Sequence, residues 1–135
     1  MNIEIKETKD VLPTDILSIY SANHWSSANK PDQLYRALLH SHSFITAWDH
    51  DKLVGLGNAL SDGHLVVYYP HLIVHPYYQR RGVGKMIMDR LQQKYKGLHQ
   101  QILVVDGKSI EFYKKFGFKM AGDTKSMWIY DGDDH

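Results

Sequence analysis

Two glycines and three cations stand close together where a helical pattern begins. The residues are, in order, Gln79, Arg80, Arg81, Gly82, Val83, Gly84 and Lys85. The first turn of a helix has four unpaired backbone N–H groups and the positive end of the dipole, and glycines let an oxyanion approach those groups closely. The stretch therefore predicts a phosphate-binding helix start. The alternative is that the glycines only end a loop beside a solvated basic patch.

Two common phosphate-binding motifs do not match this stretch. A P-loop reads G-x-x-x-x-G-K-[ST], but Met86 follows Gly84 and Lys85, and the first glycine is missing. A dinucleotide-binding fingerprint reads G-x-G-x-x-G, but Ile87 stands where the third glycine is needed. We therefore predict neither a nucleoside triphosphate site of the P-loop type nor a dinucleotide site.

Nine histidines raise the question of a metal site. The closest groupings are His40 with His42 and His71 with His75. Residues four apart on a strand share a face but lie about 13 Å apart, and neither grouping has the ligand spacing of a zinc site. We therefore predict no metal ion.

The hydrophobic pattern predicts an α/β fold that positions the phosphate-binding stretch. Helical periodicity runs from Val83 to Tyr95, and a short buried-type strand follows at residues 101–105. The other expected elements are a strand at residues 2–7, helices from Pro13 and Pro31, strands at 44–48, 53–60 and 65–74, a helix at 109–116, and two strands around Gly122 and Asp123. The order β-α-α-β-β-β-α-β-α-β-β describes a mixed, mostly antiparallel sheet flanked by helices, with one βαβ crossover.

Length and composition limit the classes of protein that the chain can represent. A chain of 135 residues suits a single domain, residues 1–135, and its net charge of +1 gives no reason to expect nucleic acid as a partner. There is no cysteine, which excludes disulfides and an acyl-cysteine intermediate. No apolar run approaches the roughly 20 residues that span a bilayer, and the first ten residues do not read as a signal peptide. We therefore expect a cytoplasmic protein without a membrane partner.

Two segments together resemble the GNAT N-acetyltransferase superfamily. Residues 79–84 match its Q/R-x-x-G-x-G/A signature at the start of the long central helix. Residues 109–122, SIEFYKKFGFKMAG, look like its A-x-x-F-Y-x-K-x-G-F segment. The expected order of elements matches as well, so the resemblance covers nearly the whole chain. Within the superfamily, the chain resembles the small stand-alone bacterial members in particular. It implies the GNAT acyl-CoA N-acyltransferase fold.

The resemblance implies acetyl-CoA as the acyl donor. Its pyrophosphate would lie on the stretch from Gln79 to Lys85. Its pantetheine arm would pair with the backbone of the strand residues Leu72, Ile73 and Val74. Two residues near the last helix, Ser109 and Tyr113, would also contact the cofactor. Pro70 would then mark the break at which the fourth and fifth strands separate to admit the cofactor, rather than an ordinary edge proline. Asp106 stands where the family often has asparagine, and we leave this carboxylate out of the cofactor site.

The same resemblance suggests catalytic and acceptor-binding residues. Tyr113 matches the frequent general acid of the family, which protonates the leaving thiolate or stabilises its charge, although it also fits a core aromatic. His71 is the candidate base, since imidazole titrates near neutrality. Alternatively, His71 recognises the charge of the substrate, or a water relay takes the place of a base. Trp25 as an aromatic wall and Asp62 as a carboxylate are the candidates for binding the amine. Both also fit ordinary packing and turn roles.

We therefore predict an acyl-CoA-dependent N-acetyltransferase. It would move an acetyl group from acetyl-CoA to a primary amine of a small molecule or a protein, by direct attack in a ternary complex. The alternative from the same fold is a catalytically silent acyl-CoA-binding regulatory or partner-binding module. A homodimer is compatible with the family. The sequence does not specify the acceptor.

Overall fold

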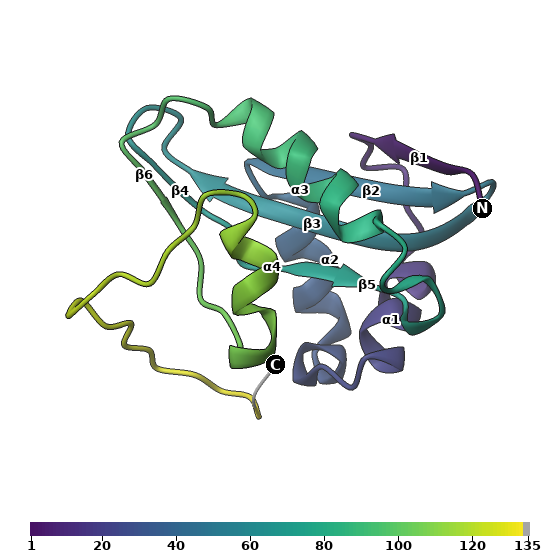
Figure 1. Cartoon of the computed structure of the whole chain (residues 1–135). Coiled ribbons are helices and arrows are strands. Elements are labelled where there is room, and N and C mark those ends of the chain that lie inside the picture. The colour runs from purple at the N-terminus through teal and green to yellow at the C-terminus, as the bar shows by residue number, and fades with distance from the viewer. Residues whose placement is uncertain (134–135) are drawn as a thin grey trace.

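The computed structural model describes residues 1–133, which are built around one open sheet (Figure 1). The strands are β1 (Ile3–Lys6), β2 (Ser43–Asp49), β3 (Lys52–Ser61), β4 (Val66–Tyr68), β5 (Leu72–Val74) and β6 (Gln100–Ile102). Their order across the sheet is β1-β2-β3-β4-β6, and β5 also pairs with β3. All pairs are antiparallel except β4 with β6. The predicted mixed, mostly antiparallel sheet is thus confirmed.

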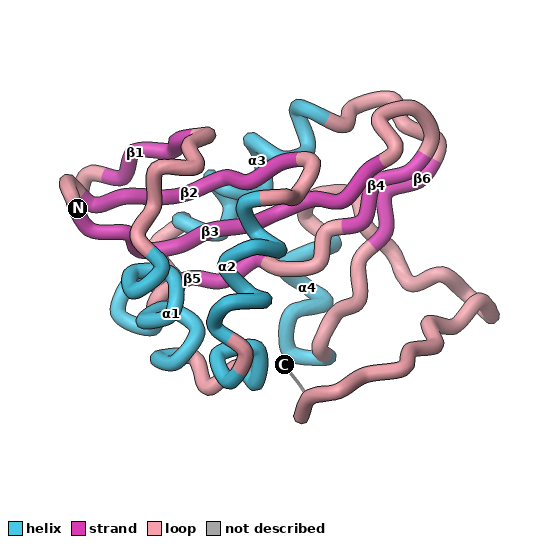
Figure 2. The backbone as a smooth tube through the Cα atoms, turned by 180° about the vertical axis from the view of Figure 1, so that it is seen from behind, coloured by secondary structure: helices cyan, strands magenta, loops and turns pink. Residues whose placement is uncertain are grey.

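Helices cover both faces of this sheet (Figures 1 and 2). One face carries α1 (Pro13–Ala22) and α2 (Pro31–Leu39), joined through the short 3-10 helix η1 (Ser26–Asn29). The other face carries α3 (Val83–Lys94) and α4 (Ile110–Lys114), which the 3-10 helices η2 (Pro76–Tyr78) and η3 (Gly107–Ser109) precede. Each layer has its own hydrophobic cluster, so the sheet separates two cores. Within residues 1–133, no helix is long and apolar enough to cross a bilayer.

The strand predicted over residues 65–74 is interrupted in its middle. Tyr69, Pro70 and His71 oppose only two residues of β3, because the paired residues on either side are Gly57 with Leu72 and Leu60 with Tyr68. Proline cannot donate a ladder hydrogen bond, so a bulge is where a strand tolerates it. β6 pairs with β4 only, and no strand of residues 1–133 covers the outer edge of β5. The sheet therefore opens where the sequence predicted a break.

Helix α3 makes the predicted crossover between the parallel strands β4 and β6. It buries one face against the sheet through Val83, Ile87, Met88 and Leu91. Glycine in β3 permits this close packing: a Cβ at Gly57 would lie 2.8 Å from Cγ2 of Ile87. The start of α3 is thereby fixed beside the open edge of β5.

The two strands predicted around Gly122 and Asp123 do not form within the described chain. Gly117 follows the end of α4 with φ of 90°, and residues 119–133 run away from the sheet without helix or strand (Figure 1). Met127, Trp128 and Ile129 of this segment are largely exposed. Their alternating pattern favours a strand, but an isolated extended segment is not stable without an edge to pair with. That is the physical reason for this wrong prediction.

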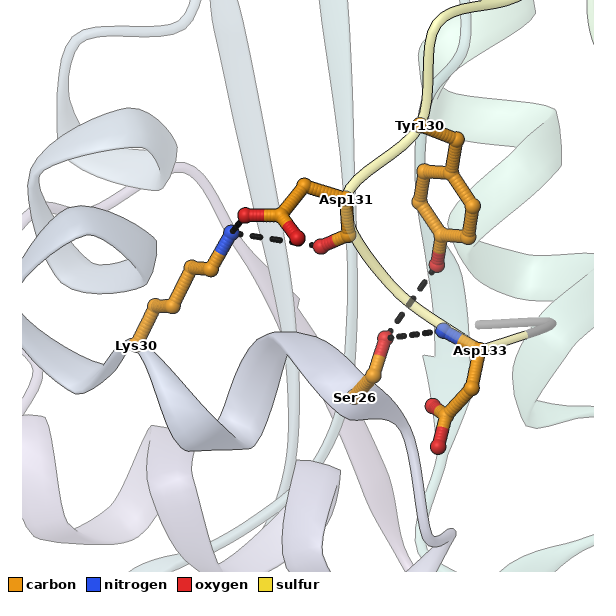
Figure 3. A network of polar contacts seen from close by, with 5 residues as sticks. All are labelled: Ser26, Lys30, Tyr130, Asp131 and Asp133. Atoms are coloured by element: carbon orange, nitrogen blue, oxygen red, sulfur yellow. Dashed lines mark hydrogen bonds and ion pairs between the residues drawn. The ribbon is translucent and has the colours of Figure 1, made fainter.

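The end of this C-terminal segment returns to η1 (Figure 3). The Tyr130 hydroxyl lies 3.2 Å from Oγ of Ser26, and the N–H of Asp133 donates to the same oxygen at 3.3 Å. Lys30 Nζ lies 2.7 Å from Oδ2 of Asp131 and lowers the pKa of that carboxyl. All of these contacts are exposed to solvent, so they position the segment but stabilise it weakly.

Candidate active site

Gly82 begins α3 in a backbone conformation that suits glycine. It is the N-cap residue with φ of 86° and ψ of 2°, and no side chain of the described chain caps the helix at this position. The first helical hydrogen bond runs from the N–H of Met86 to the carbonyl of Gly82. The N–H groups of Val83, Gly84 and Lys85 therefore lie at a helix start whose donors have no side-chain acceptor. This is the arrangement that an oxyanion needs.

The three predicted cations differ in what they contact. The Arg81 guanidinium lies over the ring of Tyr77, at 4.9 Å from its centroid. Lys85 Nζ lies 2.7 Å from a carboxylate oxygen of Asp89. Arg80 has φ of 63°, a conformation that costs a non-glycine residue about 1 kcal/mol. Two of the cations thus have partners of their own, and the backbone of the third is strained at the turn into α3.

The outer edge of β5 offers main-chain groups next to this helix start. The N–H of His75 donates to Val54 of β3, and the carbonyl of His71 accepts a hydrogen bond from β3. Because main-chain groups alternate in direction along an antiparallel strand, those of Leu72 and Val74 point away from β3. The Val74 carbonyl accepts from Nδ2 of Asn23 at 3.0 Å and from Nε2 of Gln79 at 2.9 Å. The main-chain groups of Ile73 point toward β3 instead. Of the three residues predicted to pair with the pantetheine arm, Leu72 and Val74 have the required orientation.

Gly84 at the start of α3 lies between a residue of α4 and a residue of β5. A Cβ at Gly84 would lie 3.4 Å from Cζ of Phe112 and 3.9 Å from Cγ2 of Val74. Tyr113 is the next residue along α4, and its ring contacts the ring of Phe112 edge-on, with centroids 5.0 Å apart. Burial raises the pKa of Tyr113 to about 12. Ser109 is the N-cap residue of α4. The structure therefore brings together the helix start, the open strand edge and the helix of the predicted acid.

On the other face of the sheet, three rings meet at the strand break. The Tyr20 hydroxyl of α1 lies 2.8 Å from Nδ1 of His71. The Trp25 ring stands edge-on to His71, with centroids 5.3 Å apart, and edge-on to Tyr20 at 5.6 Å. Tyr20 is fully buried. The predicted base and the predicted aromatic wall are thus neighbours, and Tyr20 connects them.

Two asparagines that the sequence analysis did not select connect these parts. Asn58 accepts the N–H of His71 at 3.0 Å and donates its own N–H to the carbonyl of His71 at 3.1 Å. Asn23 accepts from Gln79 at 2.9 Å while it donates to Val74. Asn58 has a signal in the sequence, because it is the one amide in the apolar run LVGLGNAL. Asn23 lies in a polar stretch and has no such signal.

Asp62 has a well-defined place outside these contacts. Its Oδ1 accepts the N–H groups of three residues of its own turn, at 2.8 to 3.1 Å: His64, Leu65 and Val66. These hydrogen bonds lower its pKa to about 2. Its ionised carboxylate shapes the turn between β3 and β4, and its predicted contact with an amine stays a prediction. In the part of the chain that the structure describes, no three metal-ligating side chains gather.

Comparison with known proteins agrees with this geometry. Residues 8–128 match the family model of the acetyltransferase (GNAT) domain. A GNAT-family acetyltransferase from Streptococcus pneumoniae TIGR4 is 33% identical, with a TM-score of 0.83, and the match covers 96% of this chain and 98% of that one. An aminoglycoside N-acetyltransferase in complex with CoA has the same fold, with a TM-score of 0.69 at 14% identity over 96% of this chain and 94% of that one.

A curated protein is also similar in sequence to part of this chain. It is an uncharacterized N-acetyltransferase, ycf52, from Gracilaria tenuistipitata var. liui, 32% identical over 97 residues. The match covers 65% of this chain and 53% of the relative, so the chain spans about half the length of that curated relative. The predicted family and the fold class are confirmed by these matches.

Proposed function

Since the chain belongs to the GNAT acetyltransferase family, we propose that it transfers an acetyl group from acetyl-CoA to a primary amine, by direct attack in a ternary complex. The observation that carries this proposal is the meeting of the uncapped start of α3 with the open edge of β5 and with α4. A helix start can bind a pyrophosphate and a strand edge can bind an amide-containing arm, and Tyr113 follows the residue of α4 that lies against Gly84.

The acyl donor fits this geometry through main-chain groups. The pyrophosphate of acetyl-CoA would accept hydrogen bonds from the N–H groups of Val83, Gly84 and Lys85, next to Gly82. The amides of the pantetheine arm would pair with Leu72 and Val74, which point away from β3. The complex of an aminoglycoside N-acetyltransferase of this fold with CoA supports a CoA-type donor here.

The chemistry needs no covalent enzyme intermediate. The amine nitrogen attacks the acetyl carbon, the new C–N bond forms, and the C–S bond breaks so that its electron pair leaves with sulfur. The chain has no cysteine to carry the acetyl group. The amine must lose one proton to react, since an alkylamine is mostly protonated at neutral pH, and its nitrogen must lose a second proton once the C–N bond has formed. We propose that both protons leave to water and that CoA departs as the thiolate.

Tyr113 acts on the leaving sulfur as a hydrogen-bond donor. Its pKa of about 12 lies well above that of an ordinary thiol, near 8.5, so full transfer of its proton to the thiolate is unfavourable. A donated hydrogen bond still stabilises the charge that develops on sulfur. The raised pKa also keeps the phenol neutral, and hence a donor, throughout the neutral pH range.

The acceptor side favours an amine with an apolar or aromatic body. The partly buried ring of Trp25 stands beside His71 and packs on the buried ring of Tyr20, and aromatic rings bind apolar groups and cations. We propose an arylalkyl or similarly amphipathic amine as the acceptor class, bound against Trp25.

An acceptor panel tests the proposal directly. Purified protein is mixed with acetyl-CoA and single amines, including arylalkylamines, amino acids, polyamines and peptide N-termini, and release of free CoA thiol is followed. We expect turnover with at least one arylalkylamine, and a loss of about 100-fold or more in the Tyr113→Phe variant. Binding of acetyl-CoA without turnover on any amine would contradict the proposal and favour the silent acyl-CoA-binding module.

A further inference from the structure

The C-terminal segment presents large apolar side chains to solvent on both of its faces. Met127 and Ile129 are 95% and 107% exposed, and Trp128 between them is 65% exposed. The rings of Trp128 and Tyr130 stack with centroids 4.6 Å apart, as side chains two residues apart on one face of an extended chain can do. A run that is apolar on both faces is typical of a strand inside a sheet and not at its edge. The segment therefore has the pattern of a strand that neighbours cover on both sides.

The same chain has a strand edge that could receive such a segment. β6 pairs with β4, and no strand of residues 1–133 pairs with its other edge. The N–H of Gln100 and the carbonyl of Ile102 both bond to residues that flank β4. Because main-chain groups alternate in direction along a strand, those of Gln101 point to the other edge. An unpaired edge of this kind is a template for an added strand.

A groove of about 310 Å³ lies beside this edge. Three parts of the molecule line it: Gln101 of β6, Gln92 of α3, and the chain that follows α4, with Phe116, Phe118 and Met120. Phe116 and Phe118 are only partly buried, and Met120 is exposed. The groove thus combines an unpaired strand with apolar side chains, which suits an extended segment that is itself apolar.

The chain's own C-terminal segment does not enter this groove. After the turn at Gly122 the segment runs to η1, which belongs to the helix layer on the other face of the sheet (Figures 1 and 3). There the Tyr130 hydroxyl contacts Oγ of Ser26, and Lys30 pairs with Asp131. These contacts hold the end of the segment away from β6, with its apolar side chains turned to solvent. The groove and the segment of one chain are therefore both available to another molecule.

We propose that this molecule is a second copy of the chain, and that residues 124–130 of each copy pair with β6 in the groove of the other. Each copy carries both halves of the contact, so a two-fold symmetric dimer forms the contact twice and leaves neither half open. Burial of roughly 100 Å² from each of four large side chains in each copy, with a matching area of groove, gives on the order of 1,600 Å², the standard size of a stable interface. The strand that the sequence predicts after Gly122 then forms between chains and not within one.

The mass of the protein in solution tests the proposal without any need for activity. Analytical ultracentrifugation of the unmodified chain should give about twice 15.6 kDa. Ile129→Asp should weaken the dimer about 100-fold or more, because it places a charge inside the interface. Leu12→Asp is the matched control, since Leu12 is also exposed, at 64%, but lies before α1, and this variant should remain a dimer. A monomeric unmodified chain, or a dimer that Ile129→Asp leaves intact, would overturn the proposal.

Isotope-filtered NMR distinguishes a second copy from a hairpin within one chain. In a sample refolded from ¹³C-labelled and unlabelled chains, Trp128 and Ile129 of one copy should show nuclear Overhauser effects to Gln101 and Phe118 of the other. The same effects within one chain only, or contacts of the segment with a different surface of the second copy, would overturn the proposal. The spectra use the unmodified protein, so the answer does not depend on whether a variant folds.

Discussion

The proposed cofactor side and the proposed acceptor side of the sheet opening are built from different chemical groups. On the cofactor side, the groups are main-chain N–H and C=O at the start of α3 and along β5, exposed by Gly82 and the break at Pro70. On the acceptor side, they are side chains, Tyr20, Trp25 and His71, which arrive from α1, the loop after it and the strand break. One side is therefore determined by backbone conformation and the other by packing.

This difference indicates which substitutions each side tolerates. Main-chain groups remain when a side chain is changed, so the cofactor side should respond mainly to changes of backbone conformation. Side-chain clusters lose their chemistry with one substitution. Tyr113 lies on α4 beside the cofactor side, and its phenol is proposed to act where the two sides meet.

Replacement of Tyr113 is expected to have the largest effect. Tyr113→Phe removes the donor to the leaving sulfur and should lower kcat by about 100-fold, with little change in the KM for acetyl-CoA. Steady-state kinetics with thiol release measures both constants. Tyr35→Phe, whose hydroxyl donates only to the carbonyl of Val11 in the described chain, is the control for loss of a phenol and should keep kcat. A Tyr113→Phe enzyme with normal kcat would remove Tyr113 from the mechanism.

A pair of glycines tests the cofactor side at equal structural cost. Gly82 and Gly97 have φ of 86° and 90°, and a Cβ at either would meet no atom within 4 Å. Replacement by alanine should therefore destabilise each variant by about 1–2 kcal/mol through the left-handed backbone. Gly82→Ala should also weaken acetyl-CoA binding by about tenfold, because it changes the donors at the start of α3, whereas Gly97→Ala should not. Thermal unfolding and calorimetric titration measure the two effects, and equal affinities would make Gly82 purely structural.

The acceptor side is tested by removal of its aromatic wall. Trp25→Ala should raise the KM for an arylalkylamine several-fold, by loss of ring contact worth about 1 kcal/mol. The KM for acetyl-CoA should stay the same, because Trp25 lies on the opposite face of the sheet from α3. A parallel rise in both constants would show that the two sides are not separate.

The smallest effect is expected at Asp62, which the sequence placed on the acceptor side. Its pKa of about 2 lies below the unfolded value near 3.9, so the ionised carboxylate stabilises the fold above about pH 4 and loses this effect as the pH falls through 2. Asp62→Asn should thus lower the stability slightly at neutral pH, with the difference vanishing near pH 2 in thermal unfolding. A higher KM for the amine in this variant would instead assign Asp62 to substrate binding.

The sequence predicted the backbone features of the proposed cofactor side because their signals are local. Gly82 and Gly84 stand at the start of a helical period, Pro70 interrupts an apolar run, and both features lie within one short stretch of the chain. The helix start, the strand break and the crossover were found where these signals placed them. Spacing along the chain is enough for such features, because a turn or a cap is made by neighbouring residues.

The acceptor side and the C-terminal segment depended on contacts between distant residues. Tyr20 and His71 are 51 positions apart, and no local pattern pairs them. Asn58 and Asn23 work through the same kind of distant contact. The alternation in residues 124–130 predicted a strand, but a strand needs a partner edge that the local pattern does not specify.

The most direct test of the account is a titration of backbone amides with acetyl-CoA. In ¹⁵N–¹H correlation spectra, the amides of Val83, Gly84, Lys85, Leu72 and Val74 should show the largest shifts, because these main-chain groups are proposed to bind the pyrophosphate and the pantetheine arm. Gly97 and the amides of α1 serve as internal references. Saturable binding with the largest shifts in this set is the predicted result. Binding that leaves these five amides unchanged and shifts another surface would contradict the account.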